Sequence, residues 1–263
     1  MAIEGSTYRS ISQDEFLALA ETSRDFTGIL FSPPVIFDEV DLRNSQFSRC
    51  LFQHPIVCGT DFSEAKFKDC RFVPSRFASC KFARAQFENC AFFDPDQKLG
   101  CTFAFCDLRA VEAIKCNFSI NSFERCDLYN LSAAECGFRG TKFHGSTFNR
   151  AISKKVVLTK AKFDKCNFSF ADMSGLSLQS CELLSCKFSD TALFDVDLTD
   201  AVMIGSTVDS AEWNRAKLGG TDLRGAMISG LNLAVLAEYT GLRISESQQS
   251  SILAQLGVKV SPD

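Results

Sequence analysis

The chain has 263 residues, of which 46% are apolar and 23% charged, and it carries a formal net charge of −4. It is too apolar for a disordered protein and, with 15 Gly and 6 Pro, too poor in these residues for a collagen. The negative charge argues against direct binding to nucleic acid. The lack of a long apolar run or a basic N-terminal flank argues against a transmembrane helix or a secretory signal. We therefore expect a cytoplasmic protein without membrane contact.

Phe and Cys are unusually frequent in this chain. It contains 26 Phe against 3 Tyr and 1 Trp, together with 13 Cys. An odd number of Cys in a chain without an export signal indicates reduced thiols rather than disulfides.

The first 23 residues are expected to form a capping segment. Ser12 and Glu15 make a capping box, and apolar residues follow directly. This pattern predicts a short helix over about residues 13–22. We expect the helix to close one end of the repeat array that follows.

From Phe26 onward the sequence repeats every five residues. Phe26 and Phe31 fit the step, a one-residue slip follows at Pro33-Pro34, and the array then runs to Leu233 with one interruption. We call the recurring residue the centre of its repeat. Only one centre is not apolar, and the centres are Phe37, Leu42, Phe47, Phe52, Val57, Phe62, Phe67, Phe72, Phe77, Phe82, Phe87, Phe92, Phe103, Leu108, Ala113, Phe118, Phe123, Leu128, Ala133, Phe138, Phe143, Phe148, Ser153, Leu158, Phe163, Phe168, Met173, Leu178, Leu183, Phe188, Leu193, Leu198, Met203, Val208, Trp213, Leu218, Leu223, Ile228 and Leu233.

The residue two positions before each centre is usually small, and twelve of the thirteen Cys occupy this position. Only Cys58 lies elsewhere, and we expect it to be the exposed thiol. Two inward positions in five fit neither the period of a helix nor that of a strand. If each pentapeptide forms one side of a square coil, four make a turn of about 20 residues, stacked about 4.8 Å apart as in a parallel sheet. The pattern predicts an all-β solenoid.

The interruption lies between Phe92 and Phe103. The segment 93–100 contains Pro, Asp and Gly and is expected to loop out of the solenoid. Two explanations stay open, a tolerated surface insertion and a partner-binding loop. From Ser146 to Lys165 the five-residue spacing is strict, so the sequence predicts no second loop.

Charge is unevenly distributed in the second half of the chain. Residues 139–165 hold eight basic residues and one acid, whereas residues 187–222 hold seven acids and three basic residues. An acidic rod end could imitate the phosphates of a DNA duplex, and the basic stretch could not. The alternative for both is a solvated surface without a partner. The acidic candidates for partner binding are Asp190, Asp195, Asp197, Asp200 and Asp209.

The C-terminal segment, residues 245–263, follows a register slip between Leu233 and Tyr239. Its apolar residues Ile252, Leu253 and Leu256 form one face of a helix that stops at Gly257. This face either folds over the last coil or packs on a second copy across a two-fold axis. We expect it to be a dimerisation element.

No pattern in the sequence indicates catalysis, a metal site or a cofactor. His54 and His144 are expected at outward positions several coils apart, too distant for joint acid–base chemistry. The Cys residues lack a C-x-x-C motif, and core packing explains their positions. No glycine-rich phosphate-binding motif is present. Four outward aromatic residues could contact a partner: Phe93, Phe105, Phe170 and Phe194.

Several repeats resemble the A(D/N)LXX unit of the pentapeptide-repeat family, among them CDLRA (106–110), CNFSI (116–120), ADMSG (171–175) and TDLRG (221–225). The resemblance covers roughly residues 24–244 and implies a right-handed quadrilateral β-helix. Within the family, FFDPDQKLGCTF (92–103) is similar to the first projecting loop of the Qnr branch. The segment GLRISESQQSSILAQLGVKV (241–260) resembles that branch's C-terminal helix and tail.

The Qnr branch comprises fluoroquinolone-resistance proteins that bind DNA gyrase. The resemblance implies a non-enzymatic homodimer that binds gyrase and topoisomerase IV, in part by DNA mimicry, and protects them from quinolones or another topoisomerase poison. It implies that the loop contacts the partner through Phe93, Asp94, Asp96, Gln97 and Lys98. The alternative is a structural or adaptor solenoid whose surface binds a protein unrelated to gyrase.

Overall fold

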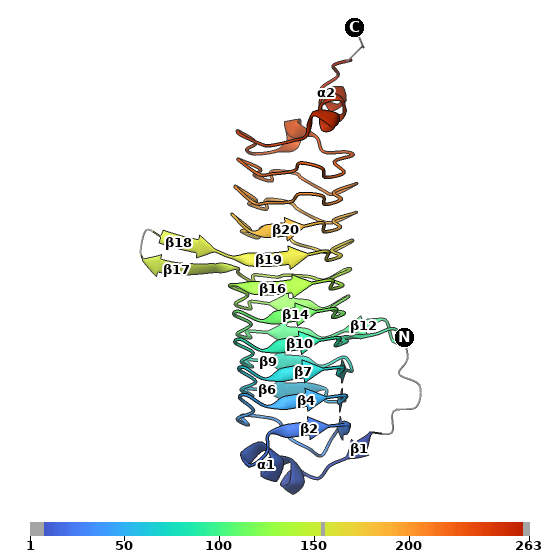
Figure 1. The fold of residues 1–263 in the computed structure, drawn as a ribbon, viewed down its shortest axis with the longest axis vertical. Helices are drawn as coiled ribbons and strands as arrows, with labels where there is room; N and C mark the ends of the chain where they lie inside the picture. The colour runs from blue at the N-terminus through green and yellow to red at the C-terminus, as the bar shows by residue number, and fades with distance from the viewer. Residues whose placement is uncertain (1–7, 154–155, 260–263) are drawn as a thin grey trace.

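The five-residue period builds a right-handed quadrilateral β-helix with a short helix at each end, as predicted (Figure 1). The computed structural model describes residues 8–153 and 156–259. The helices are α1 (Gln13–Glu21) and α2 (Gln249–Gln255), with the 3-10 turns η1 (Leu233–Val235) and η2 (Glu246–Gln248). The strands are β1 (Arg9–Ser10), β2 (Asp25–Thr27), β3 (Ile29–Phe31), β4 (Gln46–Ser48), β5 (Leu51–Phe52), β6 (Ile56–Cys58), β7 (Lys66–Lys68), β8 (Arg71–Phe72), β9 (Arg76–Ala78), β10 (Gln86–Glu88), β11 (Phe93–Asp94), β12 (Leu99–Gly100), β13 (Thr102–Ala104), β14 (Glu112–Ile114), β15 (Ser122–Glu124), β16 (Leu131–Ala134), β17 (Asn149–Ser153), β18 (Val156–Thr159), β19 (Ala161–Asp164) and β20 (Glu182–Leu184).

We number the four sides of the coil in chain order as faces 1 to 4. Face 1 is the eight-stranded parallel sheet β2-β4-β7-β10-β14-β16-β19-β20. Face 2 begins with strands β3, β5 and β8, and face 3 contains strands β6, β9, β13 and β15. Face 4 is linked by isolated parallel bridges such as Asp41 to Asp61. Each bridge joins neighbouring coils, so every face is a ladder that runs along the rod.

The predicted centres form the core. Phe rings on successive coils stack almost parallel, with centroids 4.3 Å apart for Phe72 and Phe92 and 4.7 Å apart for Phe47 and Phe67. Three predicted centres depart from this pattern: Leu233 is only partly buried, and Ser153 and Leu158 are exposed. The last two belong to an insertion described below, so their assignment to the core was wrong.

The small position is also a hydrogen-bonding position. Twelve Cys are buried, and Cys58 is half-exposed, as predicted. The Cys70 Sγ donates to the Phe47 carbonyl oxygen of the coil below at 3.4 Å. Where Thr replaces Cys, its hydroxyl makes the same bond, as from Thr60 to Phe37 at 2.8 Å. A small side chain that can donate therefore links each such coil to its neighbour.

The corners explain the polar residues of the repeat. The residue two positions after a centre often adopts positive φ, for example Arg49 at 51° and Gly140 at 66°. An Asp or Asn before the centre accepts a hydrogen bond from the amide two residues later, as Asp61 does from Ser63 at 3.0 Å. This Asx turn stabilises the bend that leads into the next side of the coil.

Candidate partner-binding surfaces

The loop predicted at residues 93–100 is a two-stranded hairpin, which we call hairpin A. Its strands β11 and β12 are antiparallel, with Phe93 opposite Gly100. The Asp94 Oδ1 accepts hydrogen bonds from the amides of Asp96 (2.9 Å) and Gln97 (3.2 Å). Asp94 therefore shapes the turn, and Phe93 is half-buried at the base. Residues 95–98 form the exposed tip, which includes the predicted Asp96, Gln97 and Lys98, and the exposed Leu99 at the start of β12 adjoins it and was not predicted.

Two residues fix the base of hairpin A against the rod. The buried Asn121 accepts a hydrogen bond from the Cys101 amide through its Oδ1 at 2.8 Å. A Cβ at Gly100 would lie 2.4 Å from that oxygen and 2.5 Å from the Ile120 carbonyl oxygen. Only glycine fits such a close approach, so the base of the hairpin is sterically defined.

A second hairpin projects from the rod, and the prediction of no second loop was wrong. The strands β17 and β18 pair antiparallel as hairpin B, with Asn149 opposite Thr159 (Figure 1). The hydrogen bond from a Cys Sγ to a carbonyl oxygen of the coil below usually joins two residues that are 23 positions apart in the sequence. The bond from Cys166 to Ala133 joins residues that are 33 positions apart. The insertion therefore adds ten residues. Ten is a multiple of the repeat, so the insertion leaves the five-residue spacing intact.

Hairpin B exposes aliphatic side chains on a strongly basic segment. Ile152, Val156, Val157 and Leu158 are each between 46% and 57% exposed. Basic residues flank them, and the segment 149–163 contains no acid. The predicted basic residues Lys154 and Lys155 lie outside the described residues. An exposed apolar cluster of this kind typically marks a contact with a partner.

The two hairpins leave the rod at opposite corners. Hairpin A connects Phe92 on face 2 to Phe103 on face 3, whereas hairpin B connects Phe148 on face 4 to Phe163 on face 1. Figure 1 shows them projecting to opposite sides. In each hairpin, the residue that follows the second strand donates a backbone hydrogen bond to the core Phe that precedes the first strand. The Cys101 amide donates to the Phe92 carbonyl oxygen, and the Lys160 amide donates to the Phe148 carbonyl oxygen, both at 3.2 Å. The rod can thus contact a partner on two sides.

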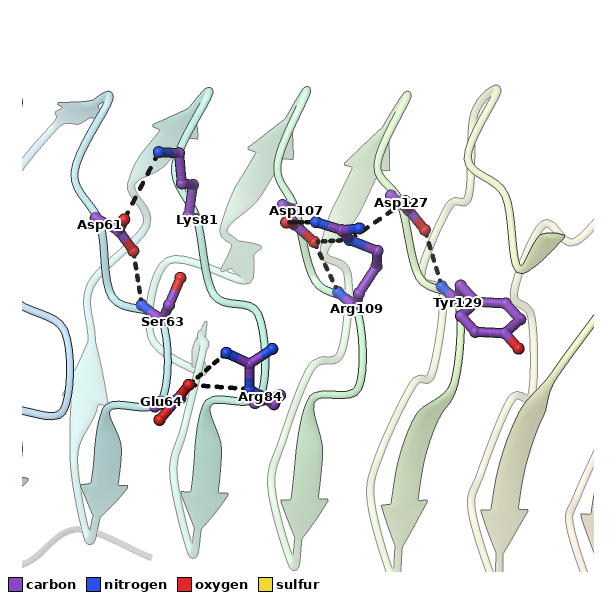
Figure 2. Close-up of polar contacts among 9 residues, drawn as sticks. All are labelled: Asp61, Ser63, Glu64, Lys81, Arg84, Asp107, Arg109, Asp127 and Tyr129. Atoms are coloured by element: carbon purple, nitrogen blue, oxygen red, sulfur yellow. Dashed lines mark hydrogen bonds and ion pairs between the residues drawn. The ribbon is translucent and has the colours of Figure 1, made fainter. Parts of the chain in front are cut away.

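Charges along face 4 largely compensate one another. Figure 2 shows Lys81 beside Asp61, 3.6 Å between Nζ and Oδ2, and Arg84 paired with Glu64. Farther along, Arg109 lies between Asp107 (2.6 Å) and Asp127 (3.6 Å). Burial acts to raise the pKa of Asp107, but the Arg109 hydrogen bonds outweigh it and lower the pKa. This stretch is therefore no continuous acidic surface.

The predicted acidic residues surround the last coils instead of sharing one face. Asp190 and Asp209 are adjacent between faces 2 and 3, where the Asp190 amide donates to the Asp209 carbonyl oxygen at 3.2 Å. Asp195 pairs with Arg215 at 2.6 Å, and Asp197 with Lys217 at 3.5 Å. Asp200 lies at the corner between faces 4 and 1, under Gly220. Asp195 and Asp197 are therefore partly neutralised by their own chain.

The C-terminal helix covers the last coil of its own chain. Ile252 is buried in the main core cluster, and the Gln248 side-chain amide donates to the carbonyl oxygens of Leu223 (2.8 Å) and Ala226 (2.6 Å). Of the three predicted dimerisation residues, Ile252 is thus not at the surface. Leu253 is half-buried, and Leu256 is exposed.

One of the two histidines does not lie where the sequence predicts it. His54 is buried rather than outward, with its ring 5.1 Å from the Phe37 ring, and burial lowers its pKa. The reason is that Pro55, which occupies the small position of this repeat, is exposed, and His54 fills the inward site instead. His144 is exposed, as predicted.

Two kinds of feature are absent from the described residues. Over residues 8–153 and 156–259, no helix is long and apolar enough to cross a membrane. Within the same ranges, no three His, Cys, Asp or Glu residues are arranged to hold a metal ion.

Comparison with known proteins agrees with this geometry. A family model for pentapeptide repeats matches residues 154–190 with eight copies, and the same ladders extend on both sides of this stretch. The chain therefore contains pentapeptide repeats. No curated protein matches it significantly.

Two solved structures show how this pentapeptide-repeat chain relates to others. Full-length QnrB1, a plasmid-mediated fluoroquinolone resistance protein, is similar with a TM-score of 0.66 and 18% identity, covering 89% of this chain and 100% of QnrB1. HetL, which is involved in heterocyst differentiation regulation in the cyanobacterium Nostoc sp. strain PCC 7120, is similar with a TM-score of 0.52 and 15% identity, covering 89% of this chain and 92% of HetL. At these identities the shared property is the fold.

Proposed function

We propose that this pentapeptide-repeat protein is a non-enzymatic cytoplasmic protein that binds DNA gyrase, with topoisomerase IV as a second partner, and protects them from quinolones or another topoisomerase poison. The observation that carries the proposal is the pair of projecting hairpins on a rod whose fold matches the full length of a fluoroquinolone resistance protein. A rigid rod with two exposed hairpin tips suits contact with a large enzyme. The Qnr-like segments at 92–103 and 241–260 support the same partner.

The proposal divides the surface into three contact regions. The tip of hairpin A contributes Asp96, Gln97, Lys98 and the exposed Leu99, and hairpin B contributes its aliphatic side chains. Asp190, Asp200 and Asp209 of the last coils form the region that imitates DNA phosphates, because Asp195, Asp197 and the acids farther down face 4 are paired with basic residues of their own chain. Energy in such interfaces is concentrated in a few residues, so we expect the hairpins to dominate binding.

The proposal includes a homodimer joined at the C-terminal end. Because Ile252 is buried against its own coil, we expect the contact to involve Leu253 and Leu256, together with the exposed Val258, whose amide donates to the Leu253 carbonyl oxygen at 2.9 Å. An end-to-end contact of this kind would place two rods in line.

Supercoiling by purified gyrase in the presence of ciprofloxacin tests the proposal. We expect added protein to restore supercoiling in a dose-dependent way and to bind gyrase directly in the absence of drug. If the protein neither binds gyrase nor spares supercoiling at any tested concentration, the proposal fails.

A second candidate is an adaptor solenoid that binds a protein unrelated to gyrase. The fold likeness to HetL favours it, because a regulatory protein shares this architecture. Affinity capture with the purified protein, followed by identification of what the two hairpins retain, separates the candidates. Retention of gyrase subunits supports the first, and retention of another protein through the same hairpins supports the second.

A further inference from the structure

A hollow of about 280 Å³ lies at the foot of hairpin B. Three arginines line it from three levels of the structure: Arg84 and Arg109 from successive coils, and Arg150 from β17. The Arg150 guanidinium carbon lies 5.8 Å from the centre of the Tyr129 ring, which lines the same hollow. Three guanidinium groups and an aromatic ring therefore meet at one place on the surface.

The arginines are available to an incoming carboxylate. Within the described residues, no carboxylate lies at ion-pair distance from Arg150. Arg84 and Arg109 are paired with Glu64, Asp107 and Asp127, as Figure 2 shows. Both arginine side chains remain about half exposed or more in these pairs, at 64% and 46%. Exposed ion pairs contribute only about 0–1 kcal/mol to stability. A guanidinium has five N–H donors, so each arginine can donate hydrogen bonds to a further carboxylate.

An aliphatic side chain accompanies Arg150 on hairpin B. Leu158 is the cross-strand partner of Arg150, so both side chains lie on the same face of hairpin B. Because Arg150 reaches Tyr129 from that face, the exposed Leu158 is turned toward the same side of the rod. The site thus combines cationic groups with an aliphatic side chain.

A larger groove of about 1050 Å³ on face 1 continues from the hollow and shares Arg84, Ala110 and Asn130 with it. It extends to Lys160 and Lys162 on the returning side of hairpin B. Its carboxylates are largely occupied, since Glu64 is paired with Arg84 and Glu182 with Lys162. An extended chain that enters the hollow would have room to continue here.

We propose that the hollow formed by Arg84, Arg109, Arg150 and Tyr129, together with Leu158, binds an acidic polypeptide segment that carries aliphatic side chains. A nucleic acid fits less well. The exposed aliphatic side chains of hairpin B have no counterpart on a phosphate backbone, whereas an acidic polypeptide can present carboxylates and aliphatic side chains together. The inference does not depend on the identity of the partner.

Fluorescence anisotropy with a labelled peptide of alternating Glu and Leu tests the proposal at low ionic strength. We expect saturable binding that weakens by about tenfold or more for Arg150→Glu and for Leu158→Asp, because each removes one half of the contact. The matched control is Lys115→Glu, which makes the same charge change at the exposed corner between faces 1 and 2 and should change affinity less than about twofold. All three side chains lie outside the core, so thermal unfolding should be unchanged.

Three results would overturn the proposal. They are no saturable peptide binding, equal loss of binding in the Lys115→Glu control, and tighter Arg150-dependent binding of a short DNA duplex than of the peptide. No topoisomerase is used, so the outcome is separate from that of the gyrase test.

Discussion

Cysteine in this protein serves as a small core residue that also donates a hydrogen bond. Seven Cys form one column at the start of face 2, and the eighth position of that column is a serine: Cys50, Cys70, Cys90, Cys116, Cys136, Cys166, Cys186 and Ser206. Each member donates to a carbonyl oxygen of face 1 in the coil below, for example Cys186 to Phe163 at 3.5 Å. The sequence alone predicts a small apolar site here. The hydrogen bond explains why Cys, Thr and Ser share it.

The two inward positions should differ strongly in their contribution to stability. Phe82→Ala removes a ring stacked 5.0 Å from Phe62 and should lower the free energy of unfolding by about 3–5 kcal/mol. Cys80→Ala removes one sulfur and a 3.4 Å bond to the Val57 carbonyl oxygen, and should cost about 1 kcal/mol. Urea unfolding of both variants measures the difference. Equal losses would contradict the assignment of the Phe column as the main core.

Buried thiols should make the protein sensitive to alkali. Burial raises the pKa of Cys101 and of Cys181 to about 12. Because the unfolded chain releases these protons at lower pH, their contribution to stability is intact below about pH 9 and is lost as pH rises toward 12, by up to about 1.4 kcal/mol per pH unit per thiol. Unfolding free energies measured across this range should fall less steeply in the Cys101→Ala/Cys181→Ala double variant. If stability fell with pH equally steeply in the double variant and the intact protein, the raised pKa of these two thiols would be contradicted.

At the scale of elements, the sequence predicts the regular coils and fails where an insertion preserves the period. Hairpin A adds six residues, because the hydrogen bond from Cys106 to Phe77 joins residues 29 positions apart instead of the usual 23. Six is not a multiple of five, so this insertion breaks the five-residue pattern. Hairpin B adds ten and does not. Its only signals are the polar centre Ser153 and a run of β-branched residues without alternation. His54 was misplaced because a proline displaced the inward position by one residue.

Both hairpins should be separable from the stability of the rod. Replacing residues 93–100 by Gly-Gly, or deleting residues 150–159, restores a five-residue step between flanking core Phe residues, and neither hairpin packs in the core. We expect thermal midpoints within a few degrees of the intact protein. As a control, Gly100→Ala keeps the hairpin but forces a Cβ against Asn121 and should be more destabilising than either removal. A large loss of stability on removing either hairpin would show that it supports the coils.

At the scale of the molecule, the structure is a rod with different chemistry at each part. Hairpins mark opposite corners of its middle, a basic segment surrounds hairpin B, and acids surround the last coils. The repeat predicts the rod because every coil buries the same inward positions against its neighbours. The placement of acids around several corners depends on three-dimensional register and could not be read from their clustering in the sequence.

The C-terminal end should control the oligomeric state. Leu256→Asp places a charge on an exposed apolar residue and should shift the protein from dimer to monomer in light scattering, with little change in unfolding. Ile252→Asp should instead destabilise the last coil, because that side chain is buried. A Leu256→Asp protein that remains a dimer would remove this helix from the interface.

The proposed protection of a type II topoisomerase depends on the two hairpins of this rod. The most direct measurement is gyrase supercoiling in the presence of ciprofloxacin, titrated with the intact protein and with the folded variants that lack hairpin A or hairpin B. We expect the intact protein to restore supercoiling and each variant to need at least about tenfold more protein for the same effect, because binding energy is concentrated at the tips. Full protection by both variants, or no protection by the intact protein, would contradict it.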